Sequence, residues 1–405
     1  MTQPSVPARP LRIGLVTPAW PGTHTANGIA TATAHLAAGL ERLGHQVTIL
    51  ANDIDGPHDH PRVVELFATG MTRLQRLRFR WAPDVVVREM QIRRLILGAR
   101  RAIADQGIDI LMLEESFGWV GAVQDALPIP VIATLHGPQW LHRTTPGKPR
   151  HGPDARREAW EAAGLRRVAG IISPSRDVLE RTRAEWGLPD VPTAVIGNPV
   201  ALGILQTPAA AFPAPALLFI GRFDRIKGAD VLLDAFARVA ARQPTCRLTF
   251  VGPDYGVVQP DGTLLHLSEA LARLPAMARD RITVVGPRSR QEIVEIRRHH
   301  PITLLASRYE TFGVALIEAM AAGSAVISTR VGGCGEILRD GETGILVPPE
   351  DPQALADACL RLLGDAELTR HLGEAARRDV AARFAPEVIA GEVARFLARF
   401  CPPRD

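Results

Sequence analysis

Two glutamates eight residues apart, Glu310 and Glu318, form the pattern with the most specific chemistry in the sequence. They lie in SRYETFGVALIEAMAAG, residues 307–323, where a predicted strand leads into a predicted helix. The helix is apolar around most of its circumference, so we expect it to be largely buried. A buried carboxylate is costly unless it is hydrogen-bonded. Glu318 should therefore either bind the two hydroxyls of a ribose or pair with a core arginine, and we favour the ribose.

The stretch between the two glutamates offers main-chain hydrogen-bond donors. Phe312, Gly313 and Val314 lead directly into the predicted helix. Free N–H groups at the positive end of a helix can hold a phosphate, and a glycine lets a ligand come close to the backbone. Taken alone, the same pattern is equally typical of an ordinary helix start.

Two cations follow a predicted buried strand in FIGRFDRIKG, residues 219–228. Arg222 and Lys227 flank the short loop between this strand and the next predicted helix. An arginine can grip two oxygens of a diphosphate, and a lysine supplies a compact point charge. A diphosphate site is one interpretation, and surface salt bridges are the other.

Two further candidates lie in the first half of the chain. His136 ends the predicted strand PVIATLH and precedes a glycine. It could hydrogen-bond a sugar hydroxyl or act as an acid or base, although a lone histidine is more often structural. The loop PGTHTANG, residues 21–28, ends at Gly28 before a helix, and it could line an acceptor site or touch the diphosphate.

Several familiar motifs do not occur. The sequence has no GxGxxG after the first predicted strand, no GxxxxGK[ST] and no GxSxG. Asp53 and Asp55 form a bare DxD, and HDH follows at residues 58–60. We interpret both as solvated loop residues, so no metal site and no cofactor is expected.

The elements that must position these residues alternate along the chain. Helices are predicted between most of the strands, and the first helix, residues 29–44, should end at Gly44. The near-continuous apolar strands indicate parallel sheets covered on both faces. The predicted strands lie at residues 11–20, 46–53, 108–115, 130–136, 170–175, 193–199, 216–223, 247–253, 281–287, 302–307, 325–330 and 344–349.

A length of 405 residues and two successive alternating series favour two doubly wound α/β domains. The uncharged, Ala- and Pro-rich residues 201–216 are the best linker candidate. We expect an N-terminal domain at 1–200 and a C-terminal domain at 201–385. A last helix begins near residue 386. Ligands of such sheets bind at the carboxyl ends of the strands, so a cleft between the domains is the expected site.

Composition limits the partners and the compartment. A net charge of +4 with 47 cations and 43 anions does not suggest a nucleic-acid binder. Four cysteines without metal-ligand spacing, no signal-peptide h-region and no apolar run of about 18 residues predict a cytoplasmic protein. Nine arginines against two acidic residues in 71–101 could contact anionic lipid at the inner face of the membrane, form a solvated ion-paired face, or bind an acidic acceptor.

Taken together, these motifs resemble glycosyltransferase family 4, whose fold is called GT-B: two Rossmann-like domains facing a central cleft. The resemblance covers nearly the whole chain. It rests on the first loop and a helix ending in GH at 44–45, on His136, on GNP at 197–199, on GRFxxxKG at 221–228 and on the Ex7E of the two glutamates. VISTRVGGCGEILRDGETGILVPPED, residues 326–351, is also similar. In place of the frequent glycine pair of the first loop, this chain has Asn27 and Gly28.

The resemblance implies a nucleotide diphosphate sugar as donor substrate, with UDP expected first and GDP second. Glu318 would bind the ribose and Glu310 the donor sugar, while His136 would reach that sugar from the first domain. Arg222 and Lys227 would hold the diphosphate, together with the backbone around Gly313. The last helix would return to the first domain.

The expected reaction retains the anomeric configuration and needs no metal, because the fixed cations stabilise the leaving diphosphate. The acceptor would be a carbohydrate, a glycolipid or a small molecule, in cell-surface polysaccharide, glycolipid or natural-product synthesis. The alternatives are a nucleotide-sugar epimerase on the same fold and a non-catalytic sugar-nucleotide-binding subunit.

Overall fold

The structure is a computed structural model, and it describes residues 9–21, 28–54, 56–67, 70–144, 152–201 and 215–401. The chain divides into two compact units. Unit 1 comprises residues 1–144, 149–199 and 386–405, and unit 2 comprises 145–148 and 200–385. Most of the predicted linker, 202–214, lies outside the described residues. Among the described residues, no helix is both long enough and apolar enough to cross a membrane.

Unit 1 is built on a parallel seven-stranded sheet with the order β3-β2-β1-β4-β5-β6-β7. The order reverses at β1, which pairs with both β2 and β4, as expected of a doubly wound sheet. The strands are β1 (Arg12–Thr17), β2 (Gln46–Ala51), β3 (Val63–Glu65), β4 (Ile110–Glu114), β5 (Val131–Thr134), β6 (Gly170–Ser173) and β7 (Thr193–Val195).

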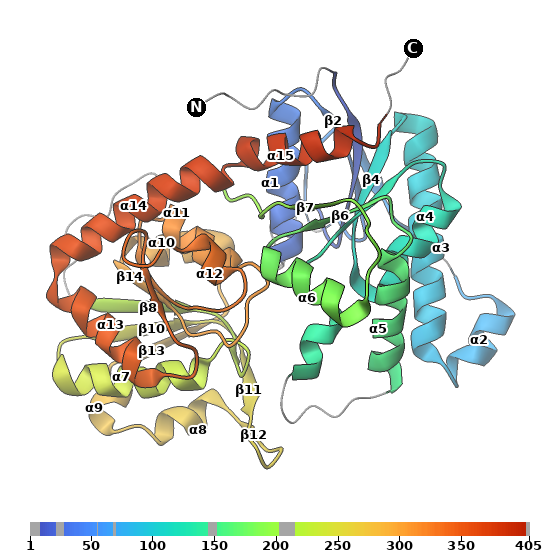
Figure 1. Cartoon of the computed structure of the whole chain (residues 1–405). Helices are drawn as coiled ribbons and strands as arrows, with labels where there is room; N and C mark the ends of the chain where they lie inside the picture. Colours follow the sequence, from blue (N-terminus) through green and yellow to red (C-terminus); the bar gives the residue numbers. More distant parts are fainter. Residues whose placement is uncertain are drawn as a thin grey trace. The chain divides into compact units, whose positions relative to one another are not determined.

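Helices cover both faces of this sheet, with α1 and α15 on one side and α3 and α4 on the other (Figure 1). The first helix ends as predicted, because Gly44 takes the left-handed conformation just beyond it, with φ of 84°. The helices are α1 (Gly28–Arg42), α2 (Arg73–Phe79), α3 (Pro83–Gln106), α4 (Trp119–Ala126), α5 (Gly152–Leu165), α6 (Arg176–Trp186) and α15 (Pro386–Ala398), with 3₁₀ turns η1 (Ser116–Gly118) and η2 (Gln139–Thr144).

The last helix, α15, belongs to unit 1 although it follows unit 2 in the chain. It packs against α1, and the contact is close because Gly39 has no side chain. A Cβ atom at Gly39 would lie 2.3 Å from the carbonyl oxygen of Pro386. Arg42 and Glu387 add an ion pair at 2.7 Å between the same two helices.

Unit 2 contains a parallel six-stranded sheet with the order β13-β10-β8-β14-β15-β16 and a small sheet, β12-β11-β9. The strands are β8 (Ala216–Ile220), β9 (Phe223–Asp224), β10 (Arg247–Val251), β11 (Asp254–Val258), β12 (Leu264–Leu265), β13 (Ile282–Gly286), β14 (Ile302–Leu305), β15 (Ala325–Thr329) and β16 (Ile345–Val347). The helices are α7 (Ala229–Arg242), α8 (Leu267–Ala272), α9 (Ala276–Arg279), α10 (Arg290–Arg298), α11 (Val314–Ala321), α12 (Cys334–Ile337), α13 (Pro352–Gly364) and α14 (Ala366–Phe384).

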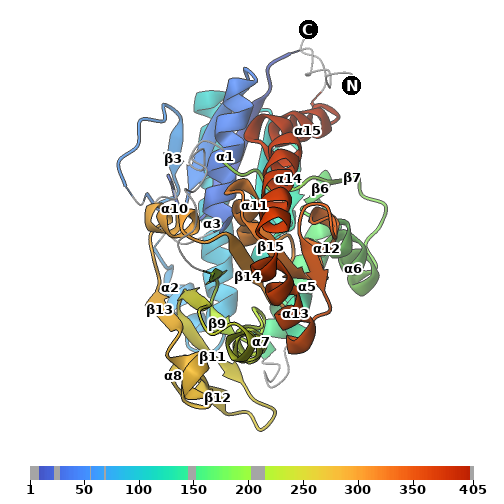
Figure 2. The same cartoon turned by 90° about the vertical axis from the view of Figure 1, so that its left-hand side faces the viewer.

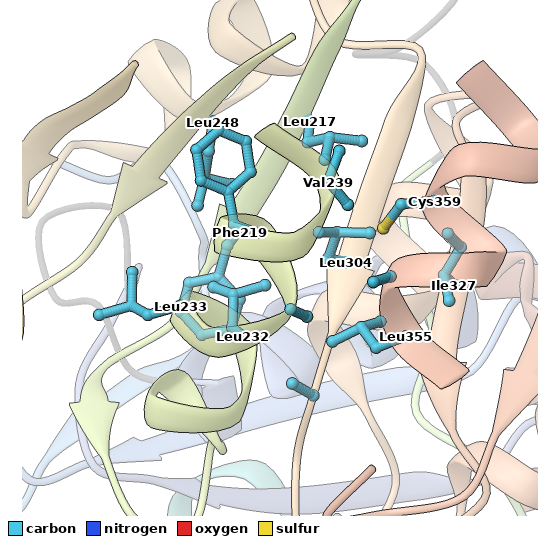
Figure 3. Packing of buried hydrophobic residues seen from close by; sticks show 14 of the residues in the cluster. Leu217, Phe219, Leu232, Leu233, Val239, Leu248, Leu304, Ile327, Leu355 and Cys359 are labelled. Carbon is cyan, nitrogen blue, oxygen red and sulfur yellow. The ribbon is translucent and has the colours of Figure 1, made fainter. Parts of the chain in front are cut away.

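The core of unit 2 lies between its main sheet and helices α7 and α13 (Figure 3). Phe219 and Leu304 come from neighbouring central strands, and Leu232 and Leu355 meet them from the two helices. Figure 2 shows α11 beside α14, which covers it. This packing fixes β8 and β14 side by side, so the loops that follow the two strands emerge at the same edge of the sheet.

Candidate active site

The loops after β8 and β14 are joined by direct contacts. The N–H of Arg308 donates to the carbonyl oxygen of Ile226 at 2.8 Å. Gly228 makes this approach possible, because it has φ of 63° and a Cβ atom there would lie 1.9 Å from the carbonyl oxygen of Ala306. The two stretches singled out in the sequence, FIGRFDRIKG and SRYETFG, therefore form one structural unit.

Three of the predicted site residues lie in one chain of polar contacts. Lys227 Nζ is 2.5 Å from Glu310 Oε1, and Arg222 Nε is 2.5 Å from Asp224 Oδ2. The other Asp224 oxygen accepts the main-chain N–H of Lys227 at 2.8 Å, and Ser307 donates its hydroxyl to Glu310 at 2.8 Å. Both cations thus face a carboxylate at the carboxyl ends of the central strands.

Glu318 has the partner that we considered less favoured. Its Oε2 accepts a hydrogen bond from Arg297 Nη2 at 3.2 Å, and the Arg297 side chain is only 2% exposed. Burial lowers the pKa of Arg297, while Glu318 acts in the opposite direction. The pairing with a core arginine is therefore observed. Glu318 itself remains 28% exposed, so the ion pair does not enclose its carboxylate.

The backbone between the two glutamates begins helix α11, with Gly313 as its N-cap residue. Gly313 has φ of 101°, and a Cβ atom there would lie 2.9 Å from Cys334 Sγ. Phe312 is buried and packs edge-on against Phe384 at 5.6 Å. Val314 is the first residue of the helix. A glycine is thus required where the strand-to-helix loop turns into α11.

His136 lies in unit 1 and lines a pocket there. Glu114 and Thr134, at the ends of β4 and β5, line the same pocket, and α1, α15 and the GNP residues 197–199 complete it. Burial lowers the pKa of His136 to about 4, so its imidazole is neutral near pH 7. Burial also raises the pKa of Glu114 to about 7.

Two wholly buried glutamates, Glu115 and Glu161, contact the main chain of the loop that begins at His136. Glu115 accepts the main-chain N–H groups of His136 and Gly137 at 2.9 and 2.8 Å. Burial, followed by the charge of Glu161, raises the pKa of Glu115 to about 8. Burial likewise raises the pKa of Glu161, against the effect of Arg157 at 2.8 Å.

The remaining predicted positions are less informative. Gly28 is the exposed first residue of α1, and residues 22–27 of the first loop lie outside the described residues. Asp55 also lies outside them. His60 Nε2 is 3.1 Å from Glu41, and the described residues contain no group of three or more His, Cys, Asp or Glu that could hold a metal ion.

Several residues that contact the predicted ones were not themselves predicted. Asp224 was visible inside FIGRFDRIKG as an acidic residue between two cations, and the doublet Glu114 and Glu115 was visible at the end of a strand. No sequence signal pointed to Arg297 or Glu161, because each reaches its partner from a helix distant in the chain.

The comparisons with known proteins agree with this architecture. Residues 26–204 match the family model described as Glycosyltransferase Family 4, and residues 214–365 match Glycosyl transferases group 1. The chain therefore contains a Glycosyltransferase Family 4 domain followed by a Glycosyl transferases group 1 domain.

Curated relatives are named D-inositol 3-phosphate glycosyltransferase. The protein of Corynebacterium glutamicum (strain R) is 34% identical over 50% of this chain and 43% of its own length. The protein of Nocardiopsis dassonvillei is 26% identical over 95% of this chain and 91% of its own. The chain thus spans less than half of the first of these relatives and most of the second.

Solved structures show the same fold. A sucrose-phosphate synthase from Thermosynechococcus elongatus has a TM-score of 0.74 and 23% identity, covering 96% of this chain and 98% of its own. Anabaena HepE, solved with UDP-glucose, has a TM-score of 0.71 and 16% identity, covering 96% and 100%. The predicted fold class is confirmed: the chain has two parallel-sheet α/β domains of the GT-B type.

Proposed function

We propose that this chain is a retaining glycosyltransferase that moves a sugar from a nucleotide diphosphate sugar, with UDP as the first candidate and GDP as the second, to an acceptor hydroxyl. The observation that carries the proposal is the chain of contacts through Arg222, Asp224, Lys227 and Glu310 at the carboxyl ends of β8 and β14. In doubly wound sheets this edge is where ligands bind. The solved complex of HepE with UDP-glucose is consistent with this choice of donor.

The cations are balanced by carboxylates that a donor can displace. As the bond to the anomeric carbon breaks, negative charge builds on the leaving diphosphate. Arg222, Lys227 and the N-terminus of α11 would stabilise this charge. Glu310, released from Lys227, would then accept hydrogen bonds from the donor sugar. Glu318 would bind the ribose while its Oε2 stays hydrogen-bonded to Arg297. Fixed cations make a metal unnecessary in this mechanism.

Unit 1 would supply the acceptor side, and His136 would reach the donor sugar from this unit. Its pocket brings together a neutral imidazole, His136, and a carboxyl group, Glu114, whose raised pKa suits it to exchange a proton near pH 7. A carbohydrate, glycolipid or small-molecule hydroxyl would be bound there. We place the reaction in the cytoplasm, in the synthesis of a surface polysaccharide, a glycolipid or a glycosylated natural product.

A panel of UDP-, GDP-, ADP- and dTDP-glucose tests the donor. A ligand at about 100 times its Kd should raise the free energy of unfolding by about 2.7 kcal/mol. The wild type should respond to one of these donors, and Lys227→Ala should lose the response.

The anomeric configuration of the product, followed by NMR, tests retention, and EDTA tests metal independence. No response to any donor, or an intact response in Lys227→Ala, would contradict the proposal, while binding without transfer to any acceptor would favour the non-catalytic subunit.

We also propose contact with anionic lipid through the surface formed by α2 and Trp81. Trp81 is 85% exposed, and Leu74 and Leu77 on α2 are 63% and 64% exposed. Exposed arginines flank them at 73, 76 and 80, and Arg76 donates to the carbonyl oxygen of Met71 at 3.4 Å. Several other arginines of 71–101 are bound in ion pairs or to carbonyl groups. An exposed tryptophan and leucines among arginines are typical of a helix that lies in a membrane interface.

Flotation with vesicles of 30% phosphatidylglycerol at low salt tests this contact. Trp81→Ala combined with Leu77→Ser should lower the partition coefficient onto the vesicles by more than tenfold, since about 0.8 kcal/mol is lost for each CH₂ group that no longer inserts. Leu264→Ser, at a half-exposed leucine of unit 2, is the matched control. Equal flotation of the two variants, or no flotation of the wild type, would remove the proposal.

A further inference from the structure

The loop after β5, residues 136–139, gives all of its main-chain N–H groups to two buried carboxylates. Glu115 accepts two of them at 2.9 and 2.8 Å, and Glu161 accepts the third at 2.7 Å. The remaining residue of the loop is a proline, which has no N–H. The backbone on which His136 is mounted is thus held at every donor that it has.

Glu161 also holds the neighbouring loop after β4. It accepts the N–H of Phe117 at 2.9 Å, and Arg157 lies 3.8 Å above the Phe117 ring while bonding Glu161 at 2.8 Å. Phe117 has φ of 59°, an unfavourable conformation for a bulky side chain that persists only where its surroundings enforce it. Arg88 donates to the carbonyl oxygens of this loop as well. The two loops at the carboxyl ends of β4 and β5 are therefore fixed to each other.

Burying these two ionisable side chains costs free energy of folding. Both carboxylates are wholly buried, and burial raises the pKa of each. Short polar side chains such as Ser or Asn can accept main-chain N–H bonds without the cost of burying an ionisable group. Two buried carboxyl groups that act on the same four-residue loop, beside the pocket that His136 lines, indicate that the position of this loop matters beyond stability.

We infer that Glu115 and Glu161 are positioning residues that hold the loop of His136 and so fix its imidazole in the pocket of unit 1. The inference rests on the proposed function for what the imidazole does, but not for how it is held. The position of the loop would matter for the reaction, because a displacement of about 1 Å at a reacting group can cost 10²-fold in rate.

The test uses Glu115→Gln in the full chain, with UDP-glucose as the donor. The amide can accept one of the two N–H groups, but its own NH₂ faces the other. We expect kcat to fall at least tenfold while the donor KM changes less than threefold. The double variant with His136→Ala should be no slower than His136→Ala alone, because Glu115 acts through His136. Glu158→Gln, which makes the same side-chain replacement on the helix of Glu161, should leave kcat unchanged.

A second readout needs no substrate. NMR of ¹³C-labelled histidines, with the signal assigned through His136→Ala, follows the pKa of His136 directly. In Glu115→Gln this pKa should rise by at least one unit, because the loosened loop admits water to the imidazole. Glu161→Gln should act in the same direction, and it serves if Glu115→Gln does not fold.

The two proposals fail in different ways. If His136→Ala turns over normally, the proposed role of His136 is wrong, but the NMR experiment still tests how the loop is held. An unchanged His136 pKa together with an unchanged kcat in a folded Glu115→Gln or Glu161→Gln variant would overturn the inference. Losses that simply add in the double variant would also overturn it, since they would indicate a general effect on folding.

Discussion

The pair formed by Arg297 and Glu318 permits a test that separates folding from donor binding. Glu318→Gln leaves the 2%-exposed guanidinium of Arg297 without a counter-charge. Removing one partner of a buried ion pair costs about 3–5 kcal/mol, and the partial exposure of Glu318 places the cost near about 3. A domain of this size loses about 2–4 °C per kcal/mol, so the Tm of unit 2 should fall by about 6–12 °C.

The reverse substitution should be milder. Arg297→Met replaces the buried charge with a side chain of similar length, and Glu318 can then be hydrated through its exposed side. We expect a cost of about 1 kcal/mol. The double variant should be about as stable as Arg297→Met alone, because no charge is left unpaired.

Donor binding should not follow the same order. If Glu318 binds the ribose, its loss removes a charged hydrogen bond worth about 1.5–3 kcal/mol, which is about a 10- to 150-fold weaker Kd. The double variant should therefore be stable but bind weakly, and Arg297→Met should bind within a few-fold of the wild type. Calorimetry gives the Tm and titration with UDP gives the Kd. A double variant that binds UDP like the wild type would show that Glu318 serves only the ion pair, and our assignment of the ribose site would be wrong.

Three further expectations follow from the same contacts. Glu310→Gln removes the carboxylate that competes for Lys227, so titration should show UDP binding a few-fold tighter while transfer from UDP-glucose becomes slower; weaker UDP binding would contradict this. Because the pKa of Glu115 in the folded protein, about 8, is raised above its usual value, the folded state keeps a proton that the unfolded state loses. The free energy of unfolding should fall as the pH rises to about 8, and urea denaturation between pH 6.5 and 8 should show a shallower fall in Glu115→Gln. Gly228 has φ of 63°, and a Cβ atom there would lie 1.9 Å from the carbonyl oxygen of Ala306. Gly228→Ala should therefore lower the free energy of unfolding by about 1–3 kcal/mol and weaken UDP binding. A calorimetric scan that gives the wild-type Tm would refute the close approach.

The fold could be predicted from the sequence because the sequence patterns that indicate it are local. Near-continuous apolar segments alternate with helices in both halves of the chain, and the structure has strands in each segment predicted to form one. The end of the first helix was equally readable, since Gly44 takes the left-handed conformation that the C-terminal glycine predicts. Neither conclusion needed information from a distant part of the chain.

That two of the stretches singled out in the sequence lie together could be predicted for a related reason. FIGRFDRIKG and SRYETFG each follow a parallel strand, and residues at the ends of adjacent parallel strands converge. That convergence brings Lys227 to within 2.5 Å of Glu310 although 83 residues separate them. The sequence did not reveal that the two would pair with each other, because charge alone does not distinguish a ligand contact from an internal one.

The partners that come from helices were not predictable. Arg297 lies near the end of the amphipathic helix α10 among other basic residues, and only the tertiary packing selects it, rather than Arg298, for burial against Glu318. Glu161 similarly reaches the loops after β4 and β5 from α5. Helix periodicity indicates which face is buried, but it does not indicate which loop a buried charge will meet.

The pairing of the two cations with carboxylates of the same chain also affects how the proposed donor site would work. Its cations, Arg222 and Lys227, rest on Asp224 and Glu310, so the site avoids uncompensated positive charge before a donor binds. When a diphosphate binds, its oxygens would replace these carboxylates as partners of Arg222 and Lys227. The diphosphate would therefore not neutralise an unpaired positive charge. The net gain per contact is then small, and selectivity for a complete donor must come from what the released Glu310 binds next. A sugar attached to the diphosphate supplies those hydroxyls, whereas a free nucleotide does not, so the carboxylates that weaken nucleotide binding would favour the donor over its product.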